Sequence, residues 1–274
     1  MIYKLNLGRS CLKVVIRTYG IKEIFIPYYS CKTIWQAIRE EDCKIKFYHI
    51  DKNFIPDCEF PKDSYILYIN YFGLFTKNCE ILSEKYKNLI TDNTQAFYAP
   101  NFGIATFNSL RKFFPVQNGA YLQIEKEPNL NFIKDNLKLE TAGMEQDYDL
   151  FKSNELKLNN EEVKLISPSV ENAMAKINYE KDKIKRLKIY NKYSQILDKY
   201  NLIKLPKVED NIPYCYPFCT NDEKFIAKLQ EFPILKLWDN LPENFYENSF
   251  LFNVGAFPLN SDIYSEKIIN KLLL

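Results

Sequence analysis

The chain has 274 residues, 46% of them hydrophobic and 15% aromatic, and its 37 basic residues nearly balance 35 acidic ones. This length is enough for one large domain, or for a large and a small domain, with a sizeable core. The net charge of +2 and the interspersed charges argue against a nucleic acid or a membrane surface as partner. No apolar run approaches transmembrane length and we expect no signal peptide, which predicts a cytoplasmic protein.

The cysteine and histidine content limits the chemistry that the chain can perform. The seven cysteines are irregularly spaced, and Cys215 and Cys219 have no second pair nearby. This pattern argues against a zinc site and predicts thiols that act as small hydrophobic side chains in a reducing compartment. Because His49 is the only histidine, we expect catalysis to use lysine, carboxylate, thiol or a cofactor.

The first half of the chain predicts strands that alternate with helices. A helix over 11–19 starts at Gly8-Arg9-Ser10 and ends at Gly20, and two more are expected over 33–40 and 77–86. Strands are expected over 23–27, 44–48, 65–71, 88–91, 104–107 and 119–124. Several of these strands are apolar throughout, which indicates an α/β fold with a mostly parallel sheet covered on both faces.

The second half predicts a connecting helix and a smaller α+β region. Residues 129–164 are polar with a helical pattern, and 169–200 predicts one long helix. Strands over 202–205 and 214–218, a helix over 222–232 and a tail helix from about residue 265 should follow. We therefore expect a large domain over 1–165, a connecting helix over 166–200 and a small C-terminal domain over 201–274.

A lysine and an aspartate are the strongest candidates for chemistry. Lys112 lies beside Arg111 and among apolar neighbours, a setting that lowers the pKa of an amine and suits it to form a Schiff base. Asp92 follows an apolar strand; it is either a turn residue or the carboxylate that keeps the pyridine nitrogen of pyridoxal phosphate (PLP) protonated. Both interpretations of Asp92 stay open at this point.

Other candidates follow from the loops at the carboxyl ends of the strands, where open parallel sheets bind ligands. Gly8, Arg9 and Ser10 would bind a phosphate at a helix start, or Ser10 would simply cap that helix. Gln95 would hydrogen-bond the ring hydroxyl of PLP, and Ser109 would bind its phosphate unless it is an ordinary turn serine.

These segments, in this order, resemble the DegT/StrS (DnrJ/EryC1-type) family of PLP-dependent sugar aminotransferases. The likeness lies in residues 8–12, 26–31, 92–95, 109–119, 213–218, 237–238 and 257–259. It implies fold type I, like aspartate aminotransferase, with a seven-stranded sheet in the large domain and a site shared by a homodimer. It also implies that Cys31 stands where a side chain stacks on the cofactor ring, with Tyr29 as a substitute, and that Asn70 belongs to the cofactor site.

The resemblance implies transfer of an amino group from glutamate to a nucleotide-linked keto sugar, for a surface polysaccharide. The chain departs from the family in three ways: it is shorter, its serine-to-lysine spacing is compressed, and no Asn-containing loop for the partner's cofactor is recognisable near 164–169.

Three alternatives follow. The chain would be a PLP-fold binding protein without turnover, which its length favours, or a PLP enzyme of another reaction type such as dehydration. A nucleotide-binding Rossmann protein is disfavoured because the chain has no Gly-x-Gly-x-x-Gly run.

Overall fold

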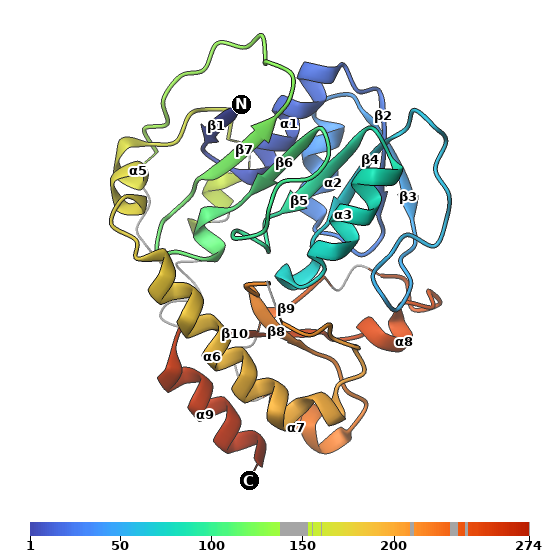
Figure 1. The fold of residues 1–274 in the computed structure, drawn as a ribbon, viewed down its shortest axis with the longest axis vertical. Coiled ribbons are helices and arrows are strands. Elements are labelled where there is room, and N and C mark those ends of the chain that lie inside the picture. The colour runs from blue at the N-terminus through green and yellow to red at the C-terminus, as the bar shows by residue number, and fades with distance from the viewer. Residues whose placement is uncertain are drawn as a thin grey trace.

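Two β-sheets organise the computed structural model (Figure 1), which describes residues 1–137, 153–154, 156–159, 161–208, 211–230, 235–238 and 241–273. The large sheet has seven strands in the order β1-β7-β6-β5-β4-β2-β3. Its strands are β1 (Ile2–Leu5), β2 (Glu23–Pro27), β3 (Lys44–Tyr48), β4 (Tyr65–Ile69), β5 (Leu89–Asn93), β6 (Ala105–Asn108) and β7 (Ala120–Ile124). The small sheet has the order β8-β10-β9 and consists of β8 (Cys215–Phe218), β9 (Leu235–Lys236) and β10 (Gly255–Pro258).

The centre of the large sheet is parallel, as the apolar strands predicted. Strands β3, β2, β4, β5 and β6 pair in parallel, whereas β7 pairs antiparallel with both β6 and β1. The register aligns Asp92 of β5 with Ile69 of β4 and Phe107 of β6, so the carboxyl ends of these strands meet at one edge. Strand β1 was not predicted, because its partly exposed edge position leaves only a weak apolar pattern.

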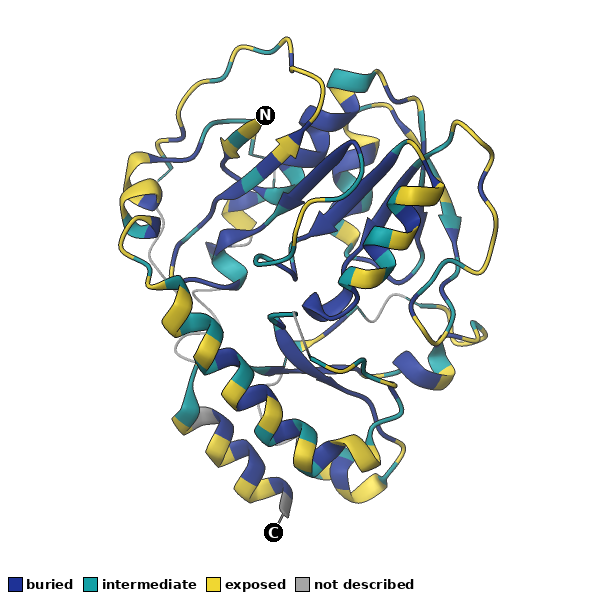
Figure 2. Ribbon diagram, in the orientation of Figure 1, coloured by how far each residue is buried: buried dark blue, intermediate teal, exposed yellow. Residues whose placement is uncertain are grey.

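Helices cover both faces of the large sheet. Helix α2 (Lys32–Arg39) follows β2 and α3 (Thr76–Lys85) follows β4, and these two crossovers run toward opposite edges of the sheet. Since parallel crossovers are right-handed, the two helices lie on opposite faces. Helix α1 (Gly8–Tyr19) packs beside α2, and Gly20 ends it in the left-handed conformation with φ 65°. The strands between these layers are mostly buried (Figure 2).

The small sheet is packed against helices from the second half of the chain. Helix α6 (Tyr179–Leu197) contacts β8 and α9 (Asp262–Leu273), and α9 contacts α7 (Glu223–Gln230). A short helix, α8 (Asn248–Leu251), and strands β9 and β10 were not predicted. The two sheets meet through aromatic rings: the ring of Trp238, from the small sheet's side, lies 4.8 Å from Tyr29 and 5.9 Å from Tyr71 between centroids.

The single long helix predicted over 169–200 is wrong, because the chain forms two helices there. Helix α5 covers Pro168–Met174, and α6 starts at Tyr179. Asn178 caps the second helix by accepting a hydrogen bond from the Lys181 backbone at 3.0 Å, and acidic residues occupy the first turn of α6. A capping residue inside the apolar pattern therefore begins a new helix.

Two further predictions are corrected. Residues 202–205 form no strand, since this segment has a single backbone bond to the end of β8, from Leu202 to Cys219. Residues 129–137 are not helical; the Leu165 carbonyl accepts a backbone hydrogen bond from Asp135, and the Leu165 N–H donates one to Ile133. The middle of the predicted polar helical segment lies outside the described residues. None of the helices in the described part of the chain is long and apolar enough to cross a membrane.

Candidate functional site

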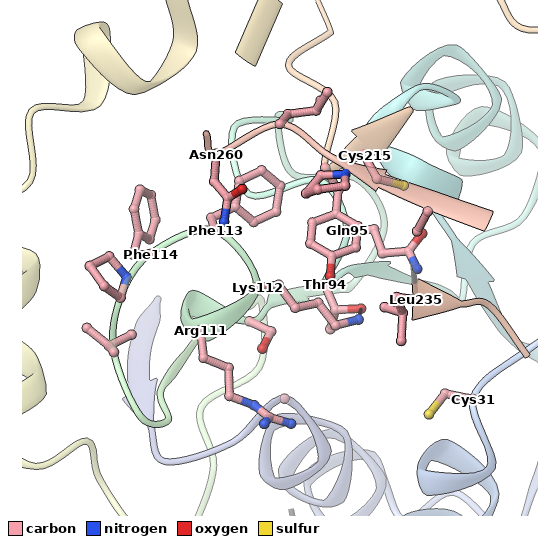
Figure 3. A pocket seen from close by; sticks show the side chains of 18 of the residues that line it. Cys31, Thr94, Gln95, Arg111, Lys112, Phe113, Phe114, Cys215, Leu235 and Asn260 are labelled. Carbon is pink, nitrogen blue, oxygen red and sulfur yellow. Dashed lines mark hydrogen bonds between the residues drawn. The ribbon is translucent and has the colours of Figure 1, made fainter. Parts of the chain in front are cut away.

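A cavity of about 850 Å³ lies between the carboxyl edge of the large sheet and the small sheet. Its wall includes seven of the residues singled out from the sequence, namely Gly8, Arg9, Cys31, Asp92, Gln95, Ser109 and Lys112. They come from several separate segments at the large sheet's edge. Leu235–Trp238 and residues 256 and 258–260 close the cavity from the small sheet's side. Figure 3 shows Lys112 extending toward Thr94 and Gln95, with Arg111 pointing away from them.

Thr94 connects the two residues that were the strongest candidates. The Lys112 Nζ donates a hydrogen bond to the Thr94 Oγ1 at 3.2 Å, and the Thr94 backbone N–H donates to the Asp92 Oδ1 at 2.7 Å. Asp92 is therefore the acceptor of a turn at the end of β5, as one interpretation of the sequence had it, and also lines the cavity. The two interpretations are compatible, because one carboxylate oxygen is engaged in the turn and the residue still belongs to the cavity wall.

Burial perturbs the acid and the amine in opposite directions. Burial lowers the pKa of Lys112 from its ordinary value, while the negative charge of Asp92 opposes that fall and the positive charge of Arg111 adds to it. Burial raises the pKa of Asp92, and the Lys112 charge and the Thr94 hydrogen bonds oppose that rise. A buried acid and a partly buried amine with shifted pKa values in one cavity are typical of a catalytic site.

One end of the cavity can hold an anion. The N-terminus of α1 lies there, and its first intrahelical bond comes from Cys11 to Leu7, so the backbone N–H groups before Cys11 have no partner within the helix. The side chains of Arg9, Ser109 and Arg111 line the same wall. Burial, together with the neighbouring Arg9 charge, lowers the pKa of Arg111 to about 10, so an anion would stabilise both guanidinium groups.

Close packing at the start of α1 favours glycine. A Cβ on Gly8 would lie 3.3 Å from the Asn108 carbonyl oxygen and 3.3 Å from the Thr94 Cγ2. The helix start can therefore approach the ends of β5 and β6 closely, which brings the N-terminal N–H groups of α1 to the same wall as Asp92.

Gln95 and Cys31 line the cavity on either side of the space in front of Lys112. The Gln95 Oε1 accepts a hydrogen bond from the Phe72 backbone at 2.7 Å, which fixes its amide and leaves the NH₂ group as a donor. Cys31 is half-buried, and its Sγ lies 3.0 Å from the Thr33 Oγ1. Among the residues of the 26–31 loop, Cys31 alone lines the cavity. This loop therefore contributes no aromatic ring to the wall.

Ser10, Tyr29 and Asn70 do not line the cavity, and their assignment to a cofactor site stays a prediction. Ser10 is fully buried in α1, and its Oγ has no hydrogen-bond partner among the described residues. The buried Tyr29 hydroxyl donates to the Leu237 carbonyl at 3.3 Å. Asn70 is also buried, and its amide donates to Thr76 and Asn93.

The sequence reasoning missed other residues of the cavity wall. Tyr214 precedes β8, and its ring centroid lies 5.9 Å from the Lys112 Nζ. Arg186 and Asp182 come from α6, far along the chain from the lysine. The Asp182–Arg186 spacing of i,i+4 is a sequence signal for a helical ion pair, but such pairs usually lie on the surface, so it could not reveal a buried one.

No family model matches this sequence, and no curated protein matches it either. Solved structures do match over nearly the whole chain. A DegT DnrJ EryC1 StrS aminotransferase from Brucella abortus is 13% identical with a TM-score of 0.65, covering 99% of this chain and 85% of that one. PseC of Helicobacter pylori, an aminotransferase of pseudoaminic acid biosynthesis, is 13% identical with a TM-score of 0.61, covering 99% and 85%. DesV of S. venezuelae is 12% identical with a TM-score of 0.68, covering 99% and 83%.

This likeness confirms the fold. The seven-stranded, mostly parallel sheet with a small antiparallel sheet is the fold of type I PLP-dependent aminotransferases. The chain is shorter than these relatives, as expected from the sequence.

Proposed function

We propose that this chain is a PLP-dependent aminotransferase that moves an amino group from glutamate to a nucleotide-linked keto sugar. The observation that carries the proposal is the linkage of Lys112 and Asp92 through Thr94 at the wall of one cavity. An amine for the cofactor aldehyde and a carboxylate for its ring nitrogen are the two groups that such an enzyme requires. The donor, the sugar acceptor and a homodimer come from the likeness to sugar aminotransferases.

The residues of the cavity fit PLP. An anion-binding end with two arginines, a serine hydroxyl and helix N-terminal N–H groups suits a phosphate, and the buried acid suits a pyridine nitrogen. A volume of about 850 Å³ also leaves room for a substrate beside the cofactor. PLP, when bound, would supply an electron sink for negative charge at a substrate carbon.

Each residue has a distinct role in the proposed reaction. Lys112 would bind the cofactor covalently and, once released by the amino donor, carry a proton at its Nζ. Asp92 would hold the ring nitrogen protonated, and Gln95 would donate its NH₂ to the ring hydroxyl. Arg9 and Ser109 would hold the phosphate at the start of α1. The closing side chains from the small sheet would exclude water from the amine.

The experiment that tests the proposal is the visible spectrum of the purified protein with PLP. We expect an absorbance band, and borohydride should then fix the cofactor on the peptide that carries Lys112. The Lys112→Ala variant should lose both signals, whereas Lys62→Ala, which changes an exposed lysine, should keep them. If wild-type protein at saturating PLP gives no band and no modified peptide, the proposal is overturned.

A second measurement separates an aminotransferase from a binding protein without turnover. Adding glutamate should convert the bound cofactor to its pyridoxamine form, which has a different spectrum. A protein that binds PLP through Lys112 but leaves the spectrum unchanged with every amino donor would be the binding protein instead. The chain's shortness relative to the matched structures is the observation that keeps this alternative open.

A further inference from the structure

Arg186 of α6 is the largest fully buried side chain in the described part of the chain, with 2% of its surface exposed. Burying a guanidinium group is costly unless its donors are satisfied. Its Nε donates to the Asp182 Oδ2 at 2.7 Å, Nη2 to the Phe113 carbonyl at 2.8 Å and Nη1 to the Tyr214 carbonyl at 3.2 Å. Its Cζ lies 4.5 Å from the centroid of the Phe113 ring.

The two carbonyls that Arg186 binds belong to the two segments that flank the Lys112 amine. Phe113 is the residue after Lys112 and ends the 3-10 turn η2 (Leu110–Lys112). Tyr214 places its ring 5.9 Å from the Lys112 Nζ, and its own N–H is held by the Phe72 carbonyl at 2.8 Å. A single guanidinium therefore fixes the backbone on both sides of the amine.

The orientation of Arg186 is set by a further, partly buried contact. The Asp182 Oδ2, which accepts from Arg186, also accepts from the Tyr98 hydroxyl at 2.9 Å. Burial and the Asp182 charge raise the pKa of Tyr98, so this hydroxyl stays a donor. The planar fork of an arginine donates in fixed directions from three nitrogens to one carboxylate and two carbonyls, whereas the three donors of a lysine all leave a single nitrogen.

We propose that Arg186 is a positioning residue for Lys112, which sets where the amine lies relative to Asp92 and the Tyr214 ring. The inference rests on the proposed function, in which Lys112 is the reacting amine. It extends that function to α6, which packs against the small sheet and so connects that sheet to the lysine. Arg186 acts through the Phe113 and Tyr214 backbones and makes no contact with reacting atoms.

The test measures the reactivity of Lys112 in the protein without cofactor. Reductive methylation at a series of pH values, read by peptide mass spectrometry, reports the fraction of Lys112 present as free amine. Release of the two carbonyls should expose the amine to water and move its pKa up toward the ordinary value. We expect about tenfold less free amine at a fixed pH near neutrality in Arg186→Met, which corresponds to about one pKa unit.

Two variants separate position from charge and from loss of folding. Arg186→Lys keeps the positive charge but not the fork, and we expect it to shift the Lys112 profile as Arg186→Met does. Asp182→Asn keeps Arg186 but removes the carboxylate that it binds, and should shift the Lys112 profile less, in the same direction. This variant provides the test if the Arg186 variants fail to fold. Arg17→Met, which removes an arginine–carboxylate pair with Glu41 on the surface, is the control and should leave the profile unchanged.

The outcomes that overturn the inference differ from those that overturn the proposed function. Unchanged Lys112 profiles in folded Arg186→Met and Arg186→Lys variants, or in Asp182→Asn where neither of these folds, would show that Arg186 serves stability alone. A shift in Arg186→Met but not in Arg186→Lys would mean that its charge, and not its geometry, acts on the amine. Either result leaves PLP attachment to wild-type Lys112 intact, whereas failure of that attachment contradicts the function and leaves the profiles interpretable.

Discussion

Lys112 and Thr94 are joined by a hydrogen bond of 3.2 Å from the lysine Nζ to the threonine Oγ1, although each follows a different strand of the large sheet. The same threonine donates its backbone N–H to Asp92. A residue that was only a spacer in the sequence thus holds the amine near the acid. The pairing of β5 with β6 makes this contact possible, because it places the ends of the two strands side by side.

The Thr94→Val variant should change the pKa of the Lys112 amine without changing the shape of the cavity. It removes the Thr94 hydroxyl, which accepts from Lys112 and also lowers the pKa of Asp92, while the backbone N–H to Asp92 remains. Because hydrogen bonds to charged groups contribute about 1.5–3 kcal/mol, the pKa of Lys112 should fall by about one unit or more. Methylation of Lys112 as a function of pH would measure this fall. Thr18→Val, which removes a hydroxyl bonded within α1, is the control, and an unchanged Lys112 profile in Thr94→Val would show that the contact does not affect the amine.

The lowered pKa of Lys112 predicts a pH dependence of stability. Between the folded pKa and the unfolded value of about 10.4, the unfolded chain binds more protons at this residue. The free energy of unfolding therefore increases as the pH rises through this range. Below the folded pKa, the buried charge costs stability. We therefore expect Lys112→Met to be more stable than wild type near pH 7, and the difference to shrink toward about pH 10 in urea titrations.

The control for this pH dependence is Lys62→Met, which changes an exposed lysine. Its difference from wild type should stay constant over the same range. Comparing each variant with wild type removes the contribution of the many tyrosines, which also titrate at alkaline pH. A Lys112→Met difference that grows with pH would contradict the lowered pKa.

Two glycines with positive φ allow a test of how closely the backbone packs at Gly73, with Gly20 as the matched control. Gly20 has φ 65°, and a Cβ added there would have no neighbouring atom within 4 Å, so Gly20→Ala should cost about 1 kcal/mol from backbone conformation alone. Gly73 has φ 74°, and its Cβ would lie 2.4 Å from the Gln95 carbonyl oxygen and 3.1 Å from that of Ile212. Gly73→Ala should cost about 1–3 kcal/mol more, because packed backbone must move. Urea unfolding measures both variants, and equal costs would show that the backbone at Gly73 yields without strain.

Cysteine alkylation offers a test of where the cofactor lies. Cys31 is half-buried at the cavity wall, Cys58 is exposed, and the other five cysteines are buried. Alkylation of Cys31 by iodoacetamide should slow in proportion to PLP occupancy, because the bound cofactor would cover that wall. Alkylation of Cys58, which does not line the cavity, should not change. Equal rates at Cys31 with and without saturating PLP would place the cofactor elsewhere.

Much of the fold could be predicted from local pattern. The helices at α1, α2 and α3 and the central strands were predicted because apolar periodicity and end signals such as Gly20 act over short distances. Strands β1, β9 and β10 were missed because they are short or lie at an edge, where burial leaves little pattern in the sequence. The helix break at Asn178 was missed because apolar residues continue on both sides of the cap.

The sequence by itself predicted an α/β chain and singled out a lysine and an aspartate as candidates for PLP chemistry, since residue type and order carry that signal. Only the tertiary structure decided which candidates share a cavity. It brought seven of ten together and left Ser10, Tyr29 and Asn70 in buried positions away from the wall. It also brought Arg186 against the segments around Lys112. The physical reason is that contacts between residues far apart in the chain depend on strand register and helix packing, which local pattern does not encode.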